Sequence, residues 1–265
     1  MQAATEEISM LTITPSAAVK VTKNDLLNGP VVIRSFFGPD EVQAILEVIK
    51  SNYDNGVNNF VPYRFPNIDW NRRADFSAET EKFNHLFSAV LLQPFREKLK
   101  SHLADLAIEP VVNDEELVFN QLTVRILQPG QMDINQHCEN QTVSYCKRFF
   151  GLLDKQMEIW DQRSLLLMLQ KPETGGDVVI YKQKWTGETD AEGQRDYLIN
   201  YDKEHGLPND NVSQIISLNP GDLLTFEAGN TWHKVSEAYG AVPRITVGGF
   251  MGLAKNSADK YLYFS

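Results

Sequence analysis

Apolar residues recur at helical spacing in two stretches of the N-terminal half, which predicts two helices that each bury one face. The first helix is expected to begin at Pro39, because proline suits a first helical turn, and the second to follow Ser77. The apolar positions are Val42, Ile45, Leu46 and Ile49 in the first, then Phe83, Leu86, Phe87, Val90 and Leu91 in the second, with Leu99, Leu103 and Leu106 after Pro94. The β-branched and aromatic run 31–37 predicts a strand, and residues 51–76 predict a loop. We expect these helices to pack against a sheet.

From residue 117 onward, short apolar runs alternate with turn residues. The turns are Pro129-Gly130, Gly175-Gly176 and Pro220-Gly221-Asp222. The expected strands are 117–127, 134–137, 165–170, 178–181, 214–218, 223–227, 231–235 and 245–251. Short strands at this density favour an all-β sandwich or jelly roll over a parallel α/β sheet. The polar stretch 183–212 predicts an insertion between strands, of a kind that often forms a substrate lid.

The length of 265 residues allows one large domain or two small ones, at roughly 100–200 residues per domain. Neither an internal repeat nor a low-complexity segment divides the chain, and we predict a single domain over 1–265. Within it, 1–116 is expected to form a helical buttress with N-terminal strands, and 117–265 the jelly-roll core. The predicted fold class is therefore mainly β with flanking helices.

Composition narrows the function classes. The formal net charge of −10 argues against a general nucleic-acid binder, because phosphate binding requires clustered Lys and Arg. The longest purely apolar run is 165–169, far short of the roughly 20 residues of a membrane-spanning helix. The first residues lack the basic start and apolar stretch of a secretion signal. Two cysteines, Cys138 and Cys146, exclude a disulfide framework or a Cys-rich zinc site, and we expect a cytoplasmic protein.

His137 stands two residues before Glu139, and in a strand such residues face the same side. One imidazole and one carboxylate would then point toward one position. This spacing suits two ligands of the facial triad, in which two histidines and one carboxylate bind non-haem Fe(II) and leave open positions. His233, within the expected strand 231–235, is the natural third ligand. Each feature is common alone, and only their combination indicates a metal site.

Arg244 and Thr246 follow on the next expected strand and would face the same side. An arginine can make two parallel charge-assisted hydrogen bonds to a carboxylate, and a hydroxyl can add a third. The pair therefore suits a dicarboxylate co-substrate that chelates the metal at its other end. Read alone, Arg244 would more often form a salt bridge to an acidic residue.

With these motifs the sequence resembles the Fe(II)/2-oxoglutarate-dependent oxygenases, whose fold is a double-stranded β-helix, also called a jelly roll and cupin-like. Residues 175–178 and 220–226 resemble the turns that open its core strands. The closer resemblance is to the aliphatic halogenases of hapalindole and welwitindolinone alkaloid biosynthesis. It covers 117–265 well and the N-terminal half loosely, through the segments 175–181, 233–237, 244–250 and 261–265.

The resemblance implies that His137, Glu139 and His233 hold Fe(II), and that Arg244 and Thr246 bind the distal carboxylate of 2-oxoglutarate. The co-substrate and O2 would be converted to succinate and CO2 as the substrate is oxidised. The related halogenases carry glycine where this chain has Glu139, which opens an iron position for chloride. The carboxylate here therefore predicts hydroxylation of an unactivated C–H bond. The expected substrate is a small molecule, either a natural product or an amino-acid-like compound.

Several alternatives stay open. Desaturation, ring formation or halogenation would fit the same family, and a zinc hydrolase could use the same two histidines and glutamate. A jelly-roll binding protein without activity is a further reading. The aromatic residues Tyr145, Phe149 and Trp185 are substrate-pocket candidates. Cys138 is expected to pack away from the metal, Arg125 is left without a role, and the oligomeric state is open.

Overall fold

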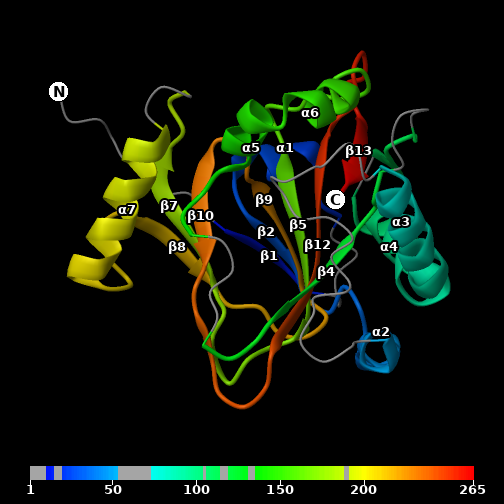
Figure 1. Ribbon diagram of the computed structural model, residues 1–265, viewed down its shortest axis with the longest axis horizontal. Helices are drawn as coiled ribbons and strands as arrows, with labels where there is room; N and C mark the ends of the chain where they lie inside the picture. The colour runs from blue at the N-terminus through cyan, green and yellow to red at the C-terminus, as the bar shows by residue number, and fades with distance from the viewer. Residues whose placement is uncertain are drawn as a thin grey trace.

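The computed structural model describes residues 10–14, 20–52, 73–103, 106–113, 119–130, 135–187 and 191–265. Within these ranges, sheets form the centre of the molecule and helices lie around them (Figure 1). The helices are α1 (Lys23–Asn28), α2 (Pro39–Asn52), α3 (Arg73–Phe87), the π-helical segment η2 (Ser88–Leu92), α4 (Gln93–His102), α5 (Glu139–Tyr145), α6 (Lys147–Leu153) and α7 (Ala191–His205). The strands are β1 (Leu11–Ile13), β2 (Val31–Ile33), β3 (Ala107–Pro110), β4 (Thr123–Leu127), β5 (Arg163–Gln170), β6 (Thr174–Gly175), β7 (Val178–Lys184), β8 (Val212–Ile216), β9 (Leu223–Glu227), β10 (Thr231–Val235), β11 (Ala238–Tyr239), β12 (Arg244–Leu253) and β13 (Lys260–Phe264).

The large sheet has β12 at its centre. In the described residues its order is β1-β2-β9-β5-β12-β13-β3, and β4 also pairs with β12. One edge of β12 is antiparallel to β5, while the other edge is antiparallel first to β4 and then to β13. The register sets Thr246 opposite Arg125 on β4 and opposite Met168 on β5. Residues from the N-terminal half, through β1, β2 and β3, thus complete the sheet formed by the C-terminal half.

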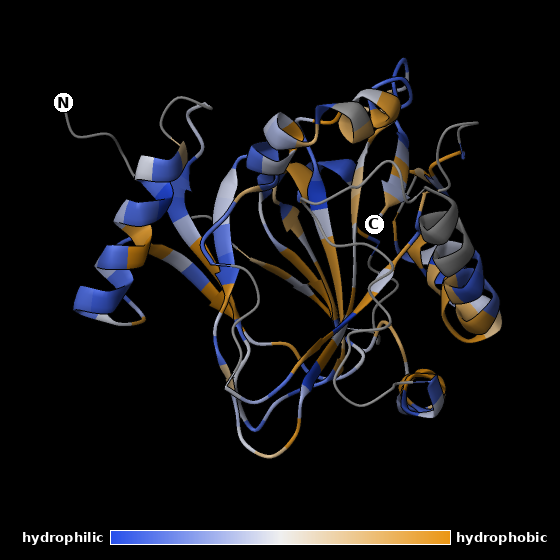
Figure 2. Cartoon of the chain, in the orientation of Figure 1, coloured by the Kyte–Doolittle hydropathy of each residue, from blue (hydrophilic) through white to orange (hydrophobic). Residues whose placement is uncertain are grey.

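The helices α2, α3 and α4 cover one face of this sheet (Figure 1). Alternate residues of each strand point to that face, because side chains on a strand alternate between its two sides. On β12 these are Ile245, Val247 and Met251, which are buried in one cluster with apolar residues of the helices. The apolar positions of the strands stand out in Figure 2. This cluster is the main hydrophobic core.

A smaller sheet of β10, β7 and β8 forms the other layer of the jelly roll. The helix α7 lies beside it (Figure 1) and buries Leu198 among Cys138, Val179, Tyr181 and Trp232. An isolated antiparallel bridge between His137 and His233 adds the segment before α5 to the edge of β10. The fold class predicted from the sequence, mainly β with flanking helices around a jelly roll, is confirmed.

Most predicted strands of the C-terminal half are present, and the first predicted helix begins at Pro39 as expected. The second helix begins at Arg73, earlier than the position after Ser77, and the strand predicted over 31–37 ends at Ile33. Of the loop predicted over 51–76, residues 53–72 lie outside the described residues. Pro94 does not end the helical stretch, because α4 continues through it to His102, directly after the π-helical segment η2.

Two differences concern the site. The predicted strand 134–137 is not formed as expected: Ile134 lies outside the described residues, and only His137 pairs, through its single bridge. The polar stretch 183–212 contains the helix α7, which the sequence did not reveal. Its buried positions are Ala191, Gln194 and Leu198, a stripe too sparse and too polar to read as an amphipathic helix. Figure 2 shows α7 as mostly hydrophilic.

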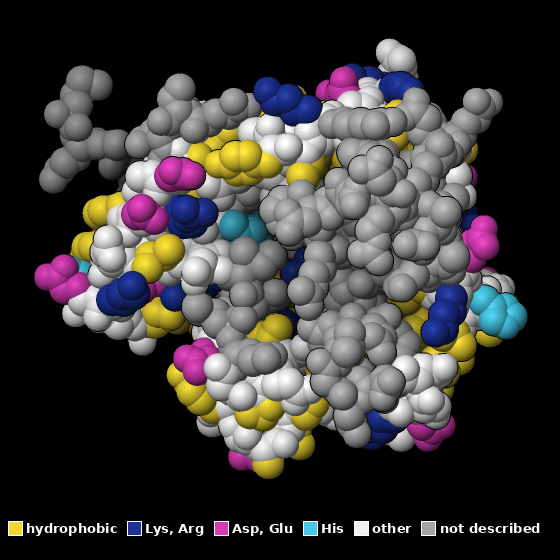
Figure 3. Space-filling view, in the orientation of Figure 1, with side chains coloured by type: hydrophobic (Ala, Val, Ile, Leu, Met, Phe, Trp, Pro, Cys, Tyr) yellow, Lys and Arg dark blue, Asp and Glu magenta, His cyan; other side chains and the backbone are white. Residues whose placement is uncertain are grey.

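The described surface agrees with the mixed composition of the chain. In the view of Figure 3, acidic and basic side chains are interspersed over the described part of this face. No helix within the described ranges combines the length and the apolar character that spanning a bilayer requires.

Candidate metal centre

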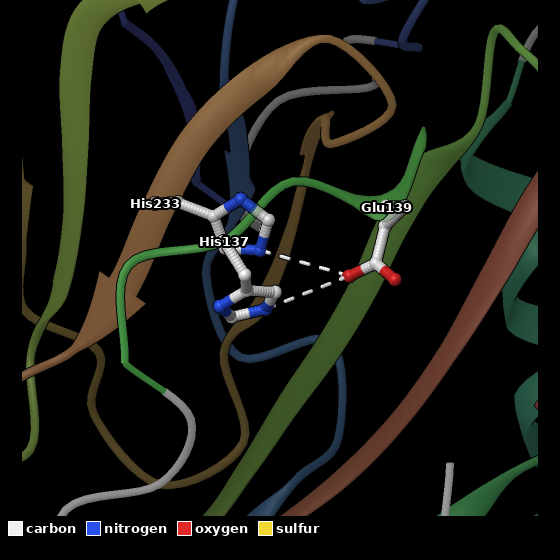
Figure 4. Close-up of side chains that lie close together, drawn as sticks. All are labelled: His137, Glu139 and His233. Carbon is white, nitrogen blue, oxygen red and sulfur yellow. Dashed lines mark ion pairs between the residues drawn. The ribbon is translucent and has the colours of Figure 1, made fainter. Parts of the chain in front are cut away.

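Three side chains from three separate elements meet inside the jelly roll: His137, Glu139 and His233 (Figure 4). Their ligand atoms all lie within 4.8 Å of one another. Oε1 of Glu139 is 3.7 Å from Nε2 of His137 and 3.8 Å from Nε2 of His233. The structure thus brings together the three residues that the sequence proposed as metal ligands, and their role as ligands stays a prediction.

The bridge between His137 and His233 places both imidazoles on one side. The backbone N–H of His137 donates to the carbonyl of His233 at 3.0 Å, and the N–H of His233 donates to the carbonyl of His137 at 2.8 Å. Residues directly opposite in an antiparallel pair have their side chains on the same face. The two rings accordingly lie with their centroids 4.3 Å apart. A single pair of backbone hydrogen bonds thus aligns two residues far apart in the sequence.

Glu139 reaches the histidines by a different route from the one predicted. It is the first residue of α5, not part of a strand, so the same-face rule for a strand does not apply to it. Its N–H donates to the carbonyl of Ala228 at 3.0 Å, and the N–H of Asn140 donates to that of Gly229 at 3.1 Å. These two bonds tie the start of α5 to the loop between β9 and β10. The carboxylate is therefore positioned by a helix start.

Cys138, between the two ligands, points the other way. It is fully buried and packs with Val179, Tyr181, Trp232 and Leu198 beneath α7, as the sequence predicted. Burial raises the pKa of its thiol to about 12. The thiol therefore stays protonated at neutral pH, and a protonated thiol is not a metal ligand.

Backbone carbonyls set the orientation and the tautomer of both histidines. Nδ1 of His137 lies 2.7 Å from the carbonyl oxygen of Asn135, and Nδ1 of His233 lies 2.8 Å from that of Thr231. A carbonyl oxygen only accepts, so each Nδ1 carries a hydrogen, and Nε2 is the nitrogen of each ring that is left for a metal ion. Burial, together with the neighbouring His137, holds the pKa of His233 well below its ordinary value. Both Nε2 atoms face Oε1 of Glu139 (Figure 4).

The donor set fits a metal ion. Two neutral imidazole nitrogens and one carboxylate oxygen are the ligands of the non-haem Fe(II) facial triad. The same three donors also occur at catalytic zinc sites, so the side chains alone do not separate the two metals. Fe(II), with 2-oxoglutarate and O2, fits this triad and this fold.

The cavity around the triad contains a second group of functional side chains. Arg125 and Thr246, opposite each other on β4 and β12, both line it. The sequence left Arg125 without a role, since only the register of β4 against β12 shows which face of the sheet it occupies. The remaining lining includes the side chains of Ser164, Leu166, Val178, Phe226, Val235 and Phe250.

Arg244 lies beside Thr246 and is buried. Its Nε donates to the carbonyl of Gly176 at 2.8 Å, and its Nη1 lies 3.5 Å from Oγ1 of Thr246. Gly176 has a φ of +69°, and a Cβ at this position would lie 2.9 Å from Cδ of Arg244. Glycine is thus required here both by the backbone conformation and by the space that the arginine occupies. The structure brings Arg244 and Thr246 together as the sequence predicted.

The three aromatic substrate candidates lie elsewhere. Tyr145 is at the end of α5 and 65% exposed, whereas Phe149 on α6 is buried in a separate apolar cluster. Trp185 packs against the cluster beneath α7 and stacks on Trp160, with ring centroids 5.9 Å apart. None of the three is among the described residues that line the cavity of the triad. Nearness in sequence to the ligands was a poor guide, because α5 and α6 lead the chain away from the site.

A jelly roll that encloses two histidines and one carboxylate fits the class of the Fe(II)/2-oxoglutarate-dependent oxygenases. Within that class, residues 7–265 match the family model described as carrier-protein-independent halogenase WelO5. This match spans nearly the whole chain, and the chain belongs to that family.

Solved structures agree on the fold. An N-substituted L-amino acid dioxygenase from Burkholderia ambifaria AMMD matches with a TM-score of 0.59 at 15% identity, covering 91% of this chain and 87% of that chain. An N-substituted L-amino acid dioxygenase from the same organism, in complex with alpha-KG, matches with a TM-score of 0.56 at 16% identity, covering 90% and 87%. No curated protein sequence matches this chain.

Proposed function

We propose that this oxygenase hydroxylates an unactivated C–H bond of a small natural product or amino-acid-like molecule. His137, Glu139 and His233 would hold the iron. When bound, Fe(II) with 2-oxoglutarate supplies the activation of O2 that C–H oxidation requires, with succinate and CO2 as co-products. The carbonyls of Asn135 and Thr231 accept from Nδ1 of the two rings and so aim both Nε2 atoms at the metal position.

One observation carries the choice of hydroxylation: the carboxylate of Glu139 lies within 3.8 Å of both Nε2 atoms. The halogenases that this chain resembles have glycine at that position and bind chloride in the place of the missing carboxylate. Here the side chain itself fills that ligand position. A halide would have to displace a carboxylate anchored through the start of α5, and hydroxyl transfer is then the expected outcome.

The co-substrate would lie along β12. Arg244 and Thr246 would bind the distal carboxylate of 2-oxoglutarate, since a guanidinium and a hydroxyl on one face suit such a group. Arg125, opposite Thr246 on β4, adds a positive charge to the cavity of the triad, which favours a dianionic co-substrate. The apolar lining from Phe226, Val178 and Phe250 leaves room for hydrocarbon and keeps bulk water away from the reacting group.

Product analysis tests this proposal. The protein is incubated with Fe(II), 2-oxoglutarate, O2 and a metabolite pool, in buffer with chloride or bromide, and both succinate and products are measured by mass spectrometry. We expect succinate together with a product that gains one oxygen atom, and no halogen isotope pattern. A control without 2-oxoglutarate should give neither.

Halogenation is the second candidate, because the matching family model describes a halogenase. A brominated product from the wild-type protein would establish it and overturn hydroxylation. A zinc hydrolase would instead show activity that depends on zinc and is indifferent to 2-oxoglutarate. A binding protein without catalysis would form no succinate with any substrate pool.

A further inference from the structure

A cluster of buried polar side chains lies behind the two histidines, on the side away from the cavity. Its centre is Asp202 on α7, and we call it the Asp202 cluster. Oδ2 of Asp202 accepts hydrogen bonds from Lys234 at 2.5 Å and Gln136 at 2.6 Å, and also from the hydroxyl of Tyr181. Oδ1 accepts from the side-chain amide of Asn209 at 2.9 Å. The elements α7, β7 and β10, together with the segments that carry Gln136 and Asn209, thus meet at one carboxylate.

Two members of the cluster are sequence neighbours of the ligands. Gln136 precedes His137, and Lys234 follows His233. Since His137 and His233 face each other across an antiparallel bridge, Gln136 and Lys234 are the next opposite pair along it. Side chains of successive residues point to opposite faces, so this pair faces α7 while the imidazoles face the cavity. Asp202 therefore joins the two ligand-bearing segments from behind.

Burial makes these contacts stronger than a surface ion pair. The side chains of Lys234 and Asp202 are only 9% and 8% exposed. Burial raises the pKa of Asp202, but hydrogen bonds from Lys234, Tyr181 and Asn209 outweigh it, and the net shift is downward. The carboxylate is therefore ionised at neutral pH. A buried charge must keep its partners, which fixes the positions of the groups that bind it.

The segment carrying His137 needs such support. In the described residues it joins β10 through one bridge only, not through a strand. The hydrogen bond from Gln136 to Asp202 is a second attachment, one residue before the ligand. We propose that Asp202 is a positioning residue of the metal centre, which holds the two histidine segments in register and couples the docking of α7 to metal binding. This inference rests on the proposed assignment of the metal ligands.

Metal affinity is the direct test, because it does not require the substrate. Apoprotein is titrated anaerobically with Co(II), and the dissociation constant is read from the visible absorption of the bound ion. The variants are Asp202→Asn, which removes the charge, and Gln136→Met, which removes the link to His137 but leaves the pair of Lys234 and Asp202. The matched control is Asp196→Asn, the same change at an exposed position of the same helix.

We expect Asp202→Asn to weaken Co(II) binding by about 10–100-fold, the usual effect of losing a group that orients metal ligands. Gln136→Met should weaken it less, and Asp196→Asn should not change it. Hydrogen exchange of α7 should slow when Co(II) binds to the wild type and should respond less in Asp202→Asn. Asp202→Asn also leaves the charge of Lys234 buried without its partner, which lowers the stability of the fold. A weaker affinity for Co(II) in this variant therefore needs a second test.

The double variant Asp202→Asn/Lys234→Met separates the two roles. It removes both buried charges and should recover thermal stability, while the affinity for Co(II) stays low. Wild-type affinity in the double variant and in Gln136→Met would overturn the positioning role. Failure of the metal assignment itself looks different: the wild type would not bind Co(II), or His137→Ala would bind it equally well.

Discussion

The two faces of β12 are made from one stretch of sequence but serve different ends. Toward the helices, Ile245, Val247 and Met251 join the main hydrophobic core. Toward the small sheet, Thr246 lines the cavity of the metal ligands, and Arg244 lies beside it, buried and hydrogen-bonded to Gly176. The alternation of a strand separates the two sets by a single residue each time.

The difference lies in what each face tolerates. An apolar core depends mainly on volume, and substitutions that conserve volume usually cost less than about 1.5 kcal/mol. A buried polar face depends on partners, because a buried donor or acceptor without one costs about 1–3 kcal/mol. We therefore expect changes on the inner face of β12, toward the small sheet, to alter catalysis. Changes on its outer face, toward the helices, should alter stability.

The largest effect is expected for Glu139→Ala, at the metal position. Loss of a group that only orients a ligand costs about 10–100-fold, so loss of a ligand should reduce hydroxylation by more than about 100-fold. The missing carboxylate also opens a position for halide, and chloride or bromide should then appear in any residual product. Product and succinate yields check this, with Glu192→Ala on the exposed side of α7 as the control. Wild-type rates in Glu139→Ala would refute the ligand assignment.

Arg244→Ala should act mainly on the co-substrate. Charge-assisted hydrogen bonds contribute about 1.5–3 kcal/mol, so the KM for 2-oxoglutarate should rise about 10–100-fold. Arg244→Lys keeps the charge but not the planar fork, and should give an intermediate KM. Steady-state kinetics with varied 2-oxoglutarate measure both. An unchanged KM in Arg244→Ala would place the co-substrate elsewhere.

A smaller effect on the same step is expected for Gly176→Ala. The new Cβ would lie 2.8 Å from Cγ of Pro172 and 2.9 Å from Cδ of Arg244, so Arg244 should shift with its surroundings, and the KM for 2-oxoglutarate should rise several-fold. The left-handed backbone adds a stability cost of about 1–2 kcal/mol. Gly130→Ala is a matched control, since Gly130 has a φ of +79° but no heavy atom of the described residues lies within 4 Å of its Cβ position. Equal KM changes in both variants would contradict the contact with Arg244.

The smallest catalytic effect is expected on the outer face, for Val247→Ala. This change deletes two buried methyl groups from the main core and should lower the free energy of unfolding by about 2 kcal/mol. Turnover and the KM for 2-oxoglutarate should stay at wild-type values at low temperature. Thermal denaturation and kinetics of the same preparation check this. A large loss of turnover in a folded variant would show that the two faces are coupled.

The strands of the jelly roll were predictable because short apolar runs and the turn residues between them are local features of the sequence. The start of α2 was predictable for the same reason, since Pro39 marks a first turn. The helix α5 was missed because it is short and begins with buried polar residues, Glu139, Asn140 and Gln141, that serve the site rather than a core. The helix α7 was missed because its inner face is partly polar, with Gln194 bonded to Trp232.

At the site, the chemistry of the ligands could be predicted and their geometry could not. Histidine and glutamate are donors whatever the fold, so their types and spacing, with the resemblance to known oxygenases, were enough to propose the triad and the arginine of the co-substrate. The route taken by Glu139 differed from the predicted strand. No role could be predicted for Arg125, because the register of β4 against β12 decides which face of the sheet this residue occupies.

Residue types and periodicity, with the resemblance to known oxygenases, were sufficient to predict the class of fold and to propose the metal donors. Folding in three dimensions alone placed the donors, since His137 is aligned by the backbone of His233 and Glu139 by the carbonyl of Ala228. The physical reason is that a local pattern encodes which face a residue prefers, whereas its partner is chosen by hydrogen bonds between segments distant in sequence. The hydrogen bonds of Asp202 to Gln136 and Lys234 likewise join segments distant in sequence, and no local pattern in α7 predicts them.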